Sequence, residues 1–272
     1  MIKSIFVPLN GLDSDRPALE AAKTLARSLG AKVSGVHIRL DTNSALALAT
    51  RETSWRIERE ENEHSAKARA AFDQVFGAEG KAPAAAIDAH WHELEGFPLY
   101  EYAFHGRMHD LIVVARERQL PEAVAEILMR TGRPVLLAPS RATETIGESV
   151  LLAWNNSAEA AKALTASMPV LLKAKKVLIA CTPETLEDES ETQRSLDELK
   201  GLLALHGLKA ETLLLKQEQG SAADMLRDAA YGARCDLIVM GAYGHSRLRE
   251  YVFGGVTREI LKECAIPVLM FH

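Results

Sequence analysis

The chain has 272 residues, of which 47% are hydrophobic and 25% charged, and its formal net charge is −5. This length favours two domains of ordinary size. The acidic balance offers no overall basic excess for nucleic acid or an anionic membrane, and no apolar stretch approaches the roughly 20 residues of a membrane span. Three scattered cysteines are too few for a disulfide framework. We therefore expect a cytoplasmic protein that binds neither nucleic acid nor membrane.

The first half alternates short apolar runs with helical patterns. The run at residues 5–9 is cut short by Asn10 and Gly11 and lacks a cleavage site, so it predicts a first strand and not a signal peptide. A short apolar run bounded by turn residues is typical of a parallel strand covered on both faces. The expected elements that follow are a helix at 17–29, a strand at 32–38, a helix at 52–76, a strand at 85–91, a short helix at 98–106 and a strand at 110–114.

The second half repeats this order. Its expected elements are a strand from 150, a helix at 158–172, a strand at 176–181, a helix at 191–206, a strand at 209–215, a helix at 222–233, a strand at 236–240 and a helix that starts near 254. The two halves match most closely at the apolar runs that follow Asp110 and Asp236. Asp110 and Asp236 are 126 positions apart in the sequence, whereas the matching residues Glu126 and Glu259 are 133 positions apart. The second half therefore carries seven extra residues after its fourth strand.

This alternation predicts an α/β fold in each half. Strands that alternate with helices favour right-handed βαβ units and a parallel sheet. The polar stretch 140–148 is the expected linker, which gives domains at 1–143 and 144–272.

The extra residues of the second half lie in a glycine-rich segment. Gly241 and Gly244 form a Gly-x-x-Gly pair as the fourth strand ends, and Gly254 follows after nine further residues. Glycine lets backbone N–H groups approach a ligand, and the start of the next helix adds free donors, so the segment suits phosphate. A lone Gly-x-x-Gly more often serves only a strand exit. The longer spacing, and its absence from the first half, favour an anion site.

The pattern Gly-2x-Gly-9x-Gly resembles the nucleotide-binding signature of the universal stress protein family. The similarity covers most of the chain, twice, although the glycine pattern occurs only in the second half, and so the chain resembles a tandem member of that family. The resemblance implies two flavodoxin-like, doubly wound domains, each a five-stranded parallel sheet of order 3-2-1-4-5, packed as a pseudo-dimer. Ligands bind at the topological switch point of such a sheet, beyond the carboxyl ends of its strands.

The resemblance also implies a nucleotide site in the second domain. Its expected contacts come from the strand ends and the glycine segment: Ala153, Trp154, Asn155, Cys181, Met240, Gly241, Gly244, His245, Gly254, Gly255, Val256 and Thr257. Two positions depart from the family pattern, because Asn155 stands for its usual Asp and Gly255 for its usual Ser or Thr. Thr257 could supply the missing hydroxyl. Trp154 could either stack on the base or block it.

The function implied is a stress-response protein whose second domain binds ATP, or ADP or AMP, with Mg²⁺ accompanying the nucleotide, and which acts as a regulatory module. The first domain looks like a degenerate copy with a structural or partner-binding role. The last strands, at 135–137 and 268–270, are expected to pair the domains within the chain, and a homodimer is a further expectation. Two alternatives stay open: a chaperone-like interaction protein that has lost nucleotide binding, and a slow ATPase.

Other residues suggest weaker hypotheses. His90 and His92 share one face of a strand and could ligate zinc, and His105 and His109 are one helical turn apart, but such pairs are more often packing or surface residues. Cys181 could be a redox sensor, although a small buried hydrophobe is the commoner role. No catalytic motif of a serine hydrolase, P-loop enzyme or zinc protease is present, so we expect no catalytic residues and at most weak ATP hydrolysis.

Overall fold

The computed structural model describes residues 1–40, 51–77, 87–116, 121–181, 189–215, 220–243 and 255–272. These residues form two compact units, Met1–Thr143 and Glu144–His272. Within the described residues, no helix is both long and apolar enough to cross a membrane.

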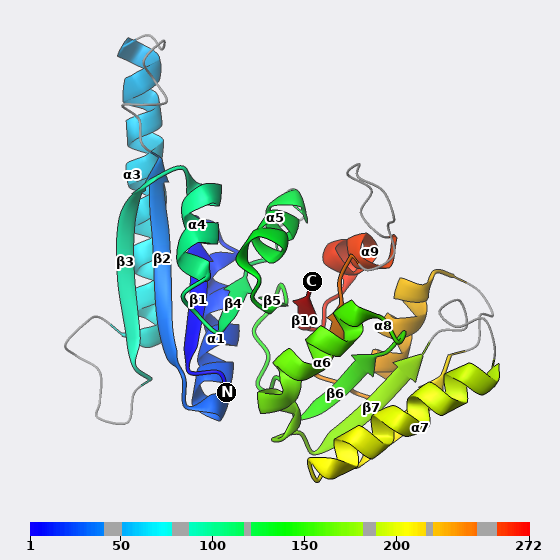
Figure 1. Cartoon of the computed structure of the whole chain (residues 1–272). Helices are drawn as coiled ribbons and strands as arrows, with labels where there is room; N and C mark the ends of the chain where they lie inside the picture. Colours follow the sequence, from blue (N-terminus) through cyan, green and yellow to red (C-terminus); the bar gives the residue numbers. More distant parts are fainter. Residues whose placement is uncertain (41–50, 78–86, 117–120, 182–188, 216–219, 244–254) are drawn as a thin grey trace. The chain divides into compact units, whose positions relative to one another are not determined.

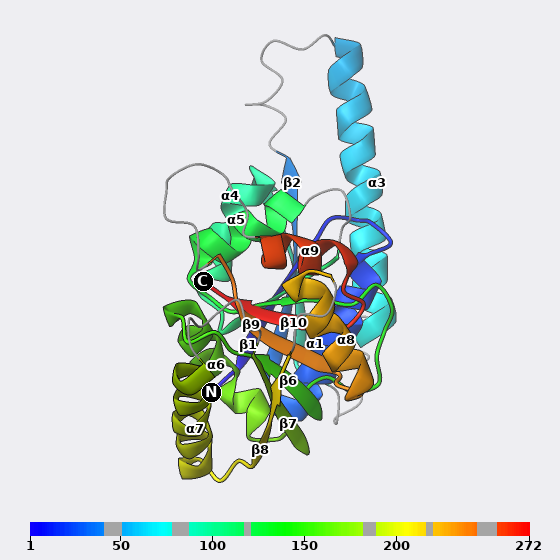
Figure 2. The ribbon, with the colours of Figure 1, turned by 90° about the vertical axis from the view of Figure 1, so that its right-hand side faces the viewer.

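Unit 1 is a parallel sheet with helices on both faces. Its elements are β1 (Ser4–Leu9), α1 (Asp15–Leu29), β2 (Lys32–Leu40), α3 (Arg51–Phe76), β3 (Ala89–Gly96), α4 (Pro98–Gly106), β4 (Leu111–Val114), α5 (Pro121–Thr131) and β5 (Val135–Leu137). The strand order is β3-β2-β1-β4-β5. Helices α1 and α3 pack together on one face, and α4 and α5 on the other (Figures 1 and 2).

Unit 2 repeats this arrangement. Its elements are β6 (Ser149–Ala153), α6 (Ala158–Leu171), β7 (Lys176–Cys181), α7 (Glu189–Leu205), β8 (Ala210–Leu214), α8 (Ala222–Gly232), β9 (Leu237–Gly241), α9 (Gly255–Glu263) and β10 (Val268–Phe271). The strand order is β8-β7-β6-β9-β10, so both described sheets have the order 3-2-1-4-5 that the resemblance implies. The first strand lies at the centre of each sheet, and its large apolar side chains, such as Phe6 and Leu151, are fully buried.

One aspartate plays the same part in both units. The carboxylate of Asp110 accepts hydrogen bonds from the backbone N–H groups of Lys3 (2.8 Å) and Ser4 (3.0 Å), and that of Asp236 accepts one from Ser149 (2.9 Å). Each carboxylate thereby ties the fourth strand to the start of the first. Burial by itself would raise the pKa of Asp110, but the hydrogen bonds from Lys3 and Ser4 and the charge of Arg133 together outweigh it, so this pKa lies below its ordinary value.

The third strand was expected in the wrong place. It was predicted at 85–91, but β3 spans Ala89–Gly96 and pairs with β2 from Val33↔Ala89 to Leu40↔Gly96. The apolar run at 85–87 misled the assignment, because a strand at the sheet edge keeps half of its side chains in water and is not a continuous apolar run. The side chains of β3 are accordingly half-buried or exposed.

Candidate functional site

The carboxyl ends of the strands in unit 2 bring several expected contacts to one edge. Strand β6 pairs with β7 at Ala153↔Ala180, and β9 pairs with β10 at Phe271↔Gly241. Because β6 also pairs with β9, at Leu152↔Val239, the carboxyl ends of β7, β6 and β9 are adjacent. This edge includes the switch point of the sheet, where doubly wound proteins bind ligands.

Trp154 follows directly after β6 and is only 9% exposed. Its backbone N–H donates to the carbonyl of Ala180 (2.8 Å), and its indole Nε1–H donates to the hydroxyl of Ser195 in α7 (2.9 Å). A protein hydroxyl therefore already satisfies the polar atom of the indole. The ring forms part of the wall between β6 and α7, which the sequence did not indicate because Ser195 lies 41 residues away.

Asn155 organises the turn between β6 and α6. Its side-chain oxygen accepts hydrogen bonds from the backbone N–H (3.2 Å) and the hydroxyl (2.7 Å) of Ser157. Ser157 in turn caps α6 by accepting from the N–H of Ala160 (3.1 Å), and Asn156 between them has φ +56°. An amide oxygen can make these contacts as well as a carboxylate, so the turn forms without the family's aspartate.

Gly241 has a packing reason to be glycine. A Cβ at this position would lie 2.6 Å from the backbone N of Ala160 and 2.6 Å from the carbonyl carbon of Glu159. The end of β9 therefore packs directly against the first turn of α6, and a larger residue at Gly241 would have to displace the strand or the helix. This contact sets how closely the end of β9 approaches the start of α6.

The other residues expected to contact a nucleotide differ in how exposed they are to solvent. Cys181 and Met240 are buried, with 0% and 5% exposure, and Thr257 is 4% exposed. Val256 is half-buried, while Gly255 is exposed and a Cβ there would meet no atom within 4 Å. The start of α9 is thus open on the side of Gly255. Gly244, His245 and Gly254 lie outside the described residues.

The equivalent edge of unit 1 is filled by its own polar groups. The buried carboxylate of Asp15 accepts the backbone N–H groups of Asn10 (3.1 Å) and Gly11 (2.7 Å). Gly11 has φ +73°, and a Cβ there would overlap the backbone of His64 in α3, with 2.6 Å to its Cα. The amides that follow β1 therefore already bind an anion, and that anion belongs to the protein.

Two further side chains close this edge. His37, only 3% exposed, donates from Nδ1 to the carbonyl of Leu9 (2.8 Å), and the hydroxyl of Tyr102 donates to the same carbonyl (2.8 Å). No sequence pattern indicated this cluster, because its members come from β1, β2 and α4. A register pair, Leu9↔His37, brings the first two together.

The histidines of the two predicted pairs contact neighbouring residues of unit 1. Nε2 of His90 lies 2.7 Å from Asp88, and the Nδ1 of His109 lies 3.2 Å from the carbonyl of His105. The described residues contain no group of three or more His, Cys, Asp or Glu that could hold a metal ion.

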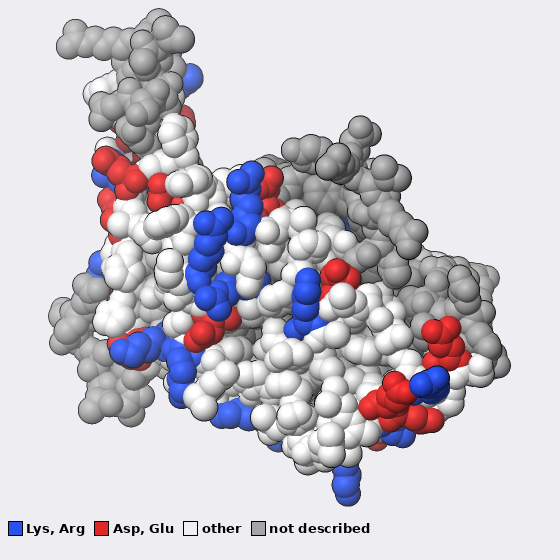
Figure 3. Space-filling view, in the orientation of Figure 1, with Lys and Arg blue, Asp and Glu red and all other residues white. Residues whose placement is uncertain are grey.

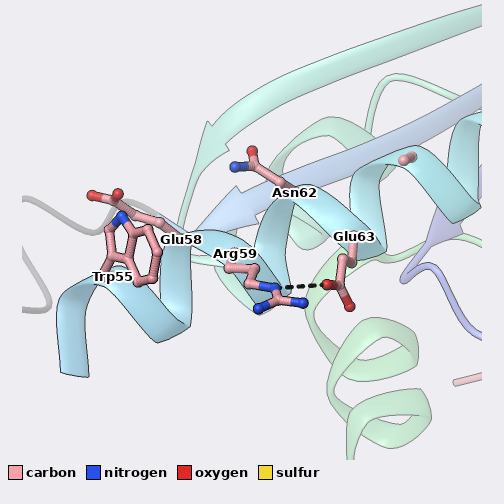
Figure 4. A pocket seen from close by; sticks show the side chains of 6 residues that line it. Trp55, Glu58, Arg59, Asn62 and Glu63 are labelled. Carbon is pink, nitrogen blue, oxygen red and sulfur yellow. Dashed lines mark hydrogen bonds and ion pairs between the residues drawn. The ribbon is translucent and has the colours of Figure 1, made fainter. Parts of the chain in front are cut away.

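A hollow of about 400 Å³ lies on α3 (Figure 4). Trp55, Glu58, Arg59, Asn62 and Glu63 line it together with Ala66, and all six belong to this one helix. Arg59 and Glu63 already form an ion pair of 3.1 Å. This hollow is a charged helix surface, as the alternating charges at 52–76 indicate, and it does not gather ligand groups from several elements.

Comparisons with known proteins agree with this architecture. Residues 148–272 match the family described as the universal stress protein family. A universal stress protein of Synechocystis is 31% identical over 146 residues, which are 54% of this chain and 49% of that protein, so the chain spans about half the length of this curated relative.

Solved structures resemble the whole chain. A universal stress protein from Archaeoglobus fulgidus has a TM-score of 0.73 at 13% identity, with 98% of this chain and 97% of that one covered. A protein of unknown function from Pseudomonas aeruginosa has a TM-score of 0.58 at 16% identity, with 99% and 92% covered. At these identities the similarity concerns the fold, and it confirms the expected fold class.

Proposed function

We propose, from the match of residues 148–272 to the universal stress protein family, that the second unit binds an adenine nucleotide and prefers ATP to ADP or AMP. Binding would serve as the regulatory signal of a stress-response module. The observation that carries the proposal is the convergence of β6, β7 and β9 at one carboxyl edge, beside a helix start that is open at Gly255.

The phosphates would bind at the start of α9. The first turn of a helix has N–H groups without intrahelical partners and a positive dipole end, which together favour an anion. Gly255 is exposed and adds no side chain there. Gly254 precedes it directly in the sequence and Gly244 lies eleven residues earlier, and a bound polyphosphate would bring Mg²⁺ with it.

The base would bind near the end of β7. Cys181 ends that strand as a small buried side chain, whereas the same position of unit 1 holds the larger ring of His37. The buried indole of Trp154 would border the site from the side of α7. Unit 1 would bind no nucleotide, because Asp15 already occupies the amides after β1, and would serve structure or a partner.

The proposal is tested at Gly255 by calorimetric titration of ATP into the full chain. Gly255→Asp introduces a negative charge that suits a helix start but repels phosphate, so the fold should persist while affinity for ATP falls at least about tenfold, or roughly 1.4 kcal/mol. Gly255→Ala is the matched control and should bind as the wild type does. Unchanged binding in Gly255→Asp, or none in the wild type, would reject the site.

One observation favours the alternative of an interaction protein without nucleotide. Trp154 and Asn155 are both engaged within the protein, by Ser195 and Ser157, and so offer less to a ligand than open side chains would. Purified protein that is denatured and analysed by mass spectrometry separates the two ideas. Released adenine nucleotide supports the proposal, and turnover of ATP above background would instead indicate the slow ATPase.

A further inference from the structure

Helix α4 of unit 1 has an apolar outer face as well as an apolar inner one. Its inner face buries Tyr102, Ala103 and Gly106. On the outside, large apolar side chains follow the helical spacing of three and four residues and are exposed by 54%, 64%, 45% and 74%: Phe97, Tyr100, Phe104 and Met108. We call these four residues the α4 stripe. A contiguous exposed apolar surface of this kind is typical of an interaction site.

The α4 stripe is bordered by arginines at its carboxyl end. Arg107 is exposed, and its Nε donates to the carbonyl of Arg130 (3.0 Å). Arg133 donates to the carbonyl of Arg107 (2.7 Å), so the guanidinium groups of Arg107 and Arg133 both lie where the ends of α4 and α5 meet, while that of Arg130 pairs with Glu126. Figure 3 shows lysine and arginine side chains gathered beside the uncharged surface over these two helices. The stripe therefore suits an apolar partner that carries negative charge at one end.

Helix α7 of unit 2 presents such a surface. Leu202 and Leu205 are exposed by 45% and 85%, and Gly201 beside them has no atom within 4 Å of its Cβ position. Towards the start of the helix, Asp197 and Glu198 are exposed. Acidic side chains gather along this helix in Figure 3. The face is thus apolar at one end and acidic at the other, and we call it the α7 face.

We propose that the α4 stripe of one copy of this chain docks antiparallel on the α7 face of a second copy. Tyr100 to Arg107 and Glu198 to Leu205 are seven residues each, so both distances are about 10.5 Å along a helix. In one antiparallel register, the apolar end of the α4 stripe therefore lies against the apolar end of the α7 face, and Arg107 lies against the acidic end.

The same register also gives the ring of Phe104 a place to pack. When Tyr100 lies opposite Leu205, Phe104 lies opposite Gly201. A large side chain against a glycine lets two helices approach closely, and in the described part of the chain no atom lies within 4 Å of the Cβ position of Gly201. The stacked rings of Tyr100 and Phe104, 6.4 Å apart, would form one surface against α7.

The charged residues would determine that the two helices pack antiparallel. Arg107 lies opposite Glu198, whose present partner is the exposed Arg194 at 3.0 Å. Such an exposed pair contributes little, so Glu198 can exchange it for a contact that docking removes from water. Since each chain carries both surfaces, the proposed assembly is a two-fold dimer in which the contact occurs twice, because a contact made once per chain would propagate into a chain of molecules.

Light scattering coupled to gel filtration, from micromolar to hundreds of micromolar protein, tests the proposal. The wild type should dimerise. Phe104→Glu and Gly201→Gln should each weaken the dimer at least about tenfold. The control Leu172→Glu changes an equally exposed leucine elsewhere and should not. A wild type that stays monomeric, or a dimer that these two variants leave intact, overturns the proposal.

A charge exchange makes the test specific for this pair of surfaces. Arg107→Glu and Glu198→Arg should each weaken the homodimer, because like charges then meet at both contacts. Mixing the two single variants should restore dimers, since each copy then meets an opposite charge at both contacts. Circular dichroism shows whether both variants are folded. Failure of the mixture to dimerise, while both variants are folded, contradicts the α4–α7 contact.

Discussion

The two units share a strand order but differ in what occupies the carboxyl end of the first strand. In unit 1 the amides of Asn10 and Gly11 bind the carboxylate of Asp15, and the carbonyl of Leu9 accepts from two buried side chains. In unit 2 the corresponding turn is held by the side-chain oxygen of Asn155, which accepts hydrogen bonds from Ser157. The two units therefore share one scaffold and differ in the polar side chains at this edge, and we propose that this difference leaves only the second edge able to bind a ligand.

The largest expected effect comes from the glycines at these edges. Gly241→Val should destabilise unit 2 by about 3 kcal/mol or more, because the side chain would overlap the backbone of α6. Gly11→Val should do the same to unit 1, where φ is +73°. Urea unfolding followed by circular dichroism measures both. A loss below about 0.5 kcal/mol in either variant would mean that the close approach is not required.

Replacing the internal anion of unit 1 tests the comparison directly. Asp15→Asn should cost about 2 kcal/mol, because two buried backbone N–H groups then share a single acceptor. The urea midpoint measures the loss. Asp13→Asn, a nearby exposed aspartate, is the control and should leave the midpoint unchanged. Equal midpoints for the two variants would show that the carboxylate does not hold the loop.

The wall of the site in unit 2 should respond to the loss of one hydrogen bond. Trp154→Phe removes the indole donor and leaves the hydroxyl of Ser195 without it, which should cost about 1–2 kcal/mol. A double-mutant cycle with Ser195→Ala measures the coupling between the two side chains. A coupling energy of zero would mean that the indole is held by packing alone.

The smallest effect concerns pH. The pKa of Asp110 is lowered in the folded protein, so its contribution to stability is present above the unfolded value of about 3.9 and is lost as pH falls through the folded value. Asp110→Asn should cost about 1 kcal/mol at neutral pH and nothing once the wild-type carboxyl is protonated. Unfolding measured at neutral and strongly acidic pH gives the difference, and a difference that does not shrink in acid would contradict this assignment.

The sequence predicted the parts of the fold that depend on local patterns. Apolar runs after Asp110 and Asp236 indicated matching strands, and both aspartates bind the start of the first strand in their unit. The third strand was misplaced because an edge strand such as Ala89–Gly96 is largely polar. Sequence spacing alone gave Gly241 a ligand role, whereas its contact with α6 shows a packing role as well.

The closed edge of unit 1 could not be predicted from the sequence. Asp15, His37 and Tyr102 come from three elements, and each alone is compatible with many environments. All three bind the backbone at residues 9–11, and this becomes visible only when strand pairing and helix packing bring them to the end of β1. The same holds for Trp154 and Ser195, whose contact depends on how α7 lies against β6.

The stoichiometry of nucleotide binding to the full chain tests the central comparison most directly. Calorimetric titration with ATP should give one site per chain, and Asp15→Asn should leave that number unchanged because His37 and Tyr102 still fill the first edge. Two sites per chain, or a single site that survives Gly255→Asp, would contradict the account of an open second unit beside a closed first one.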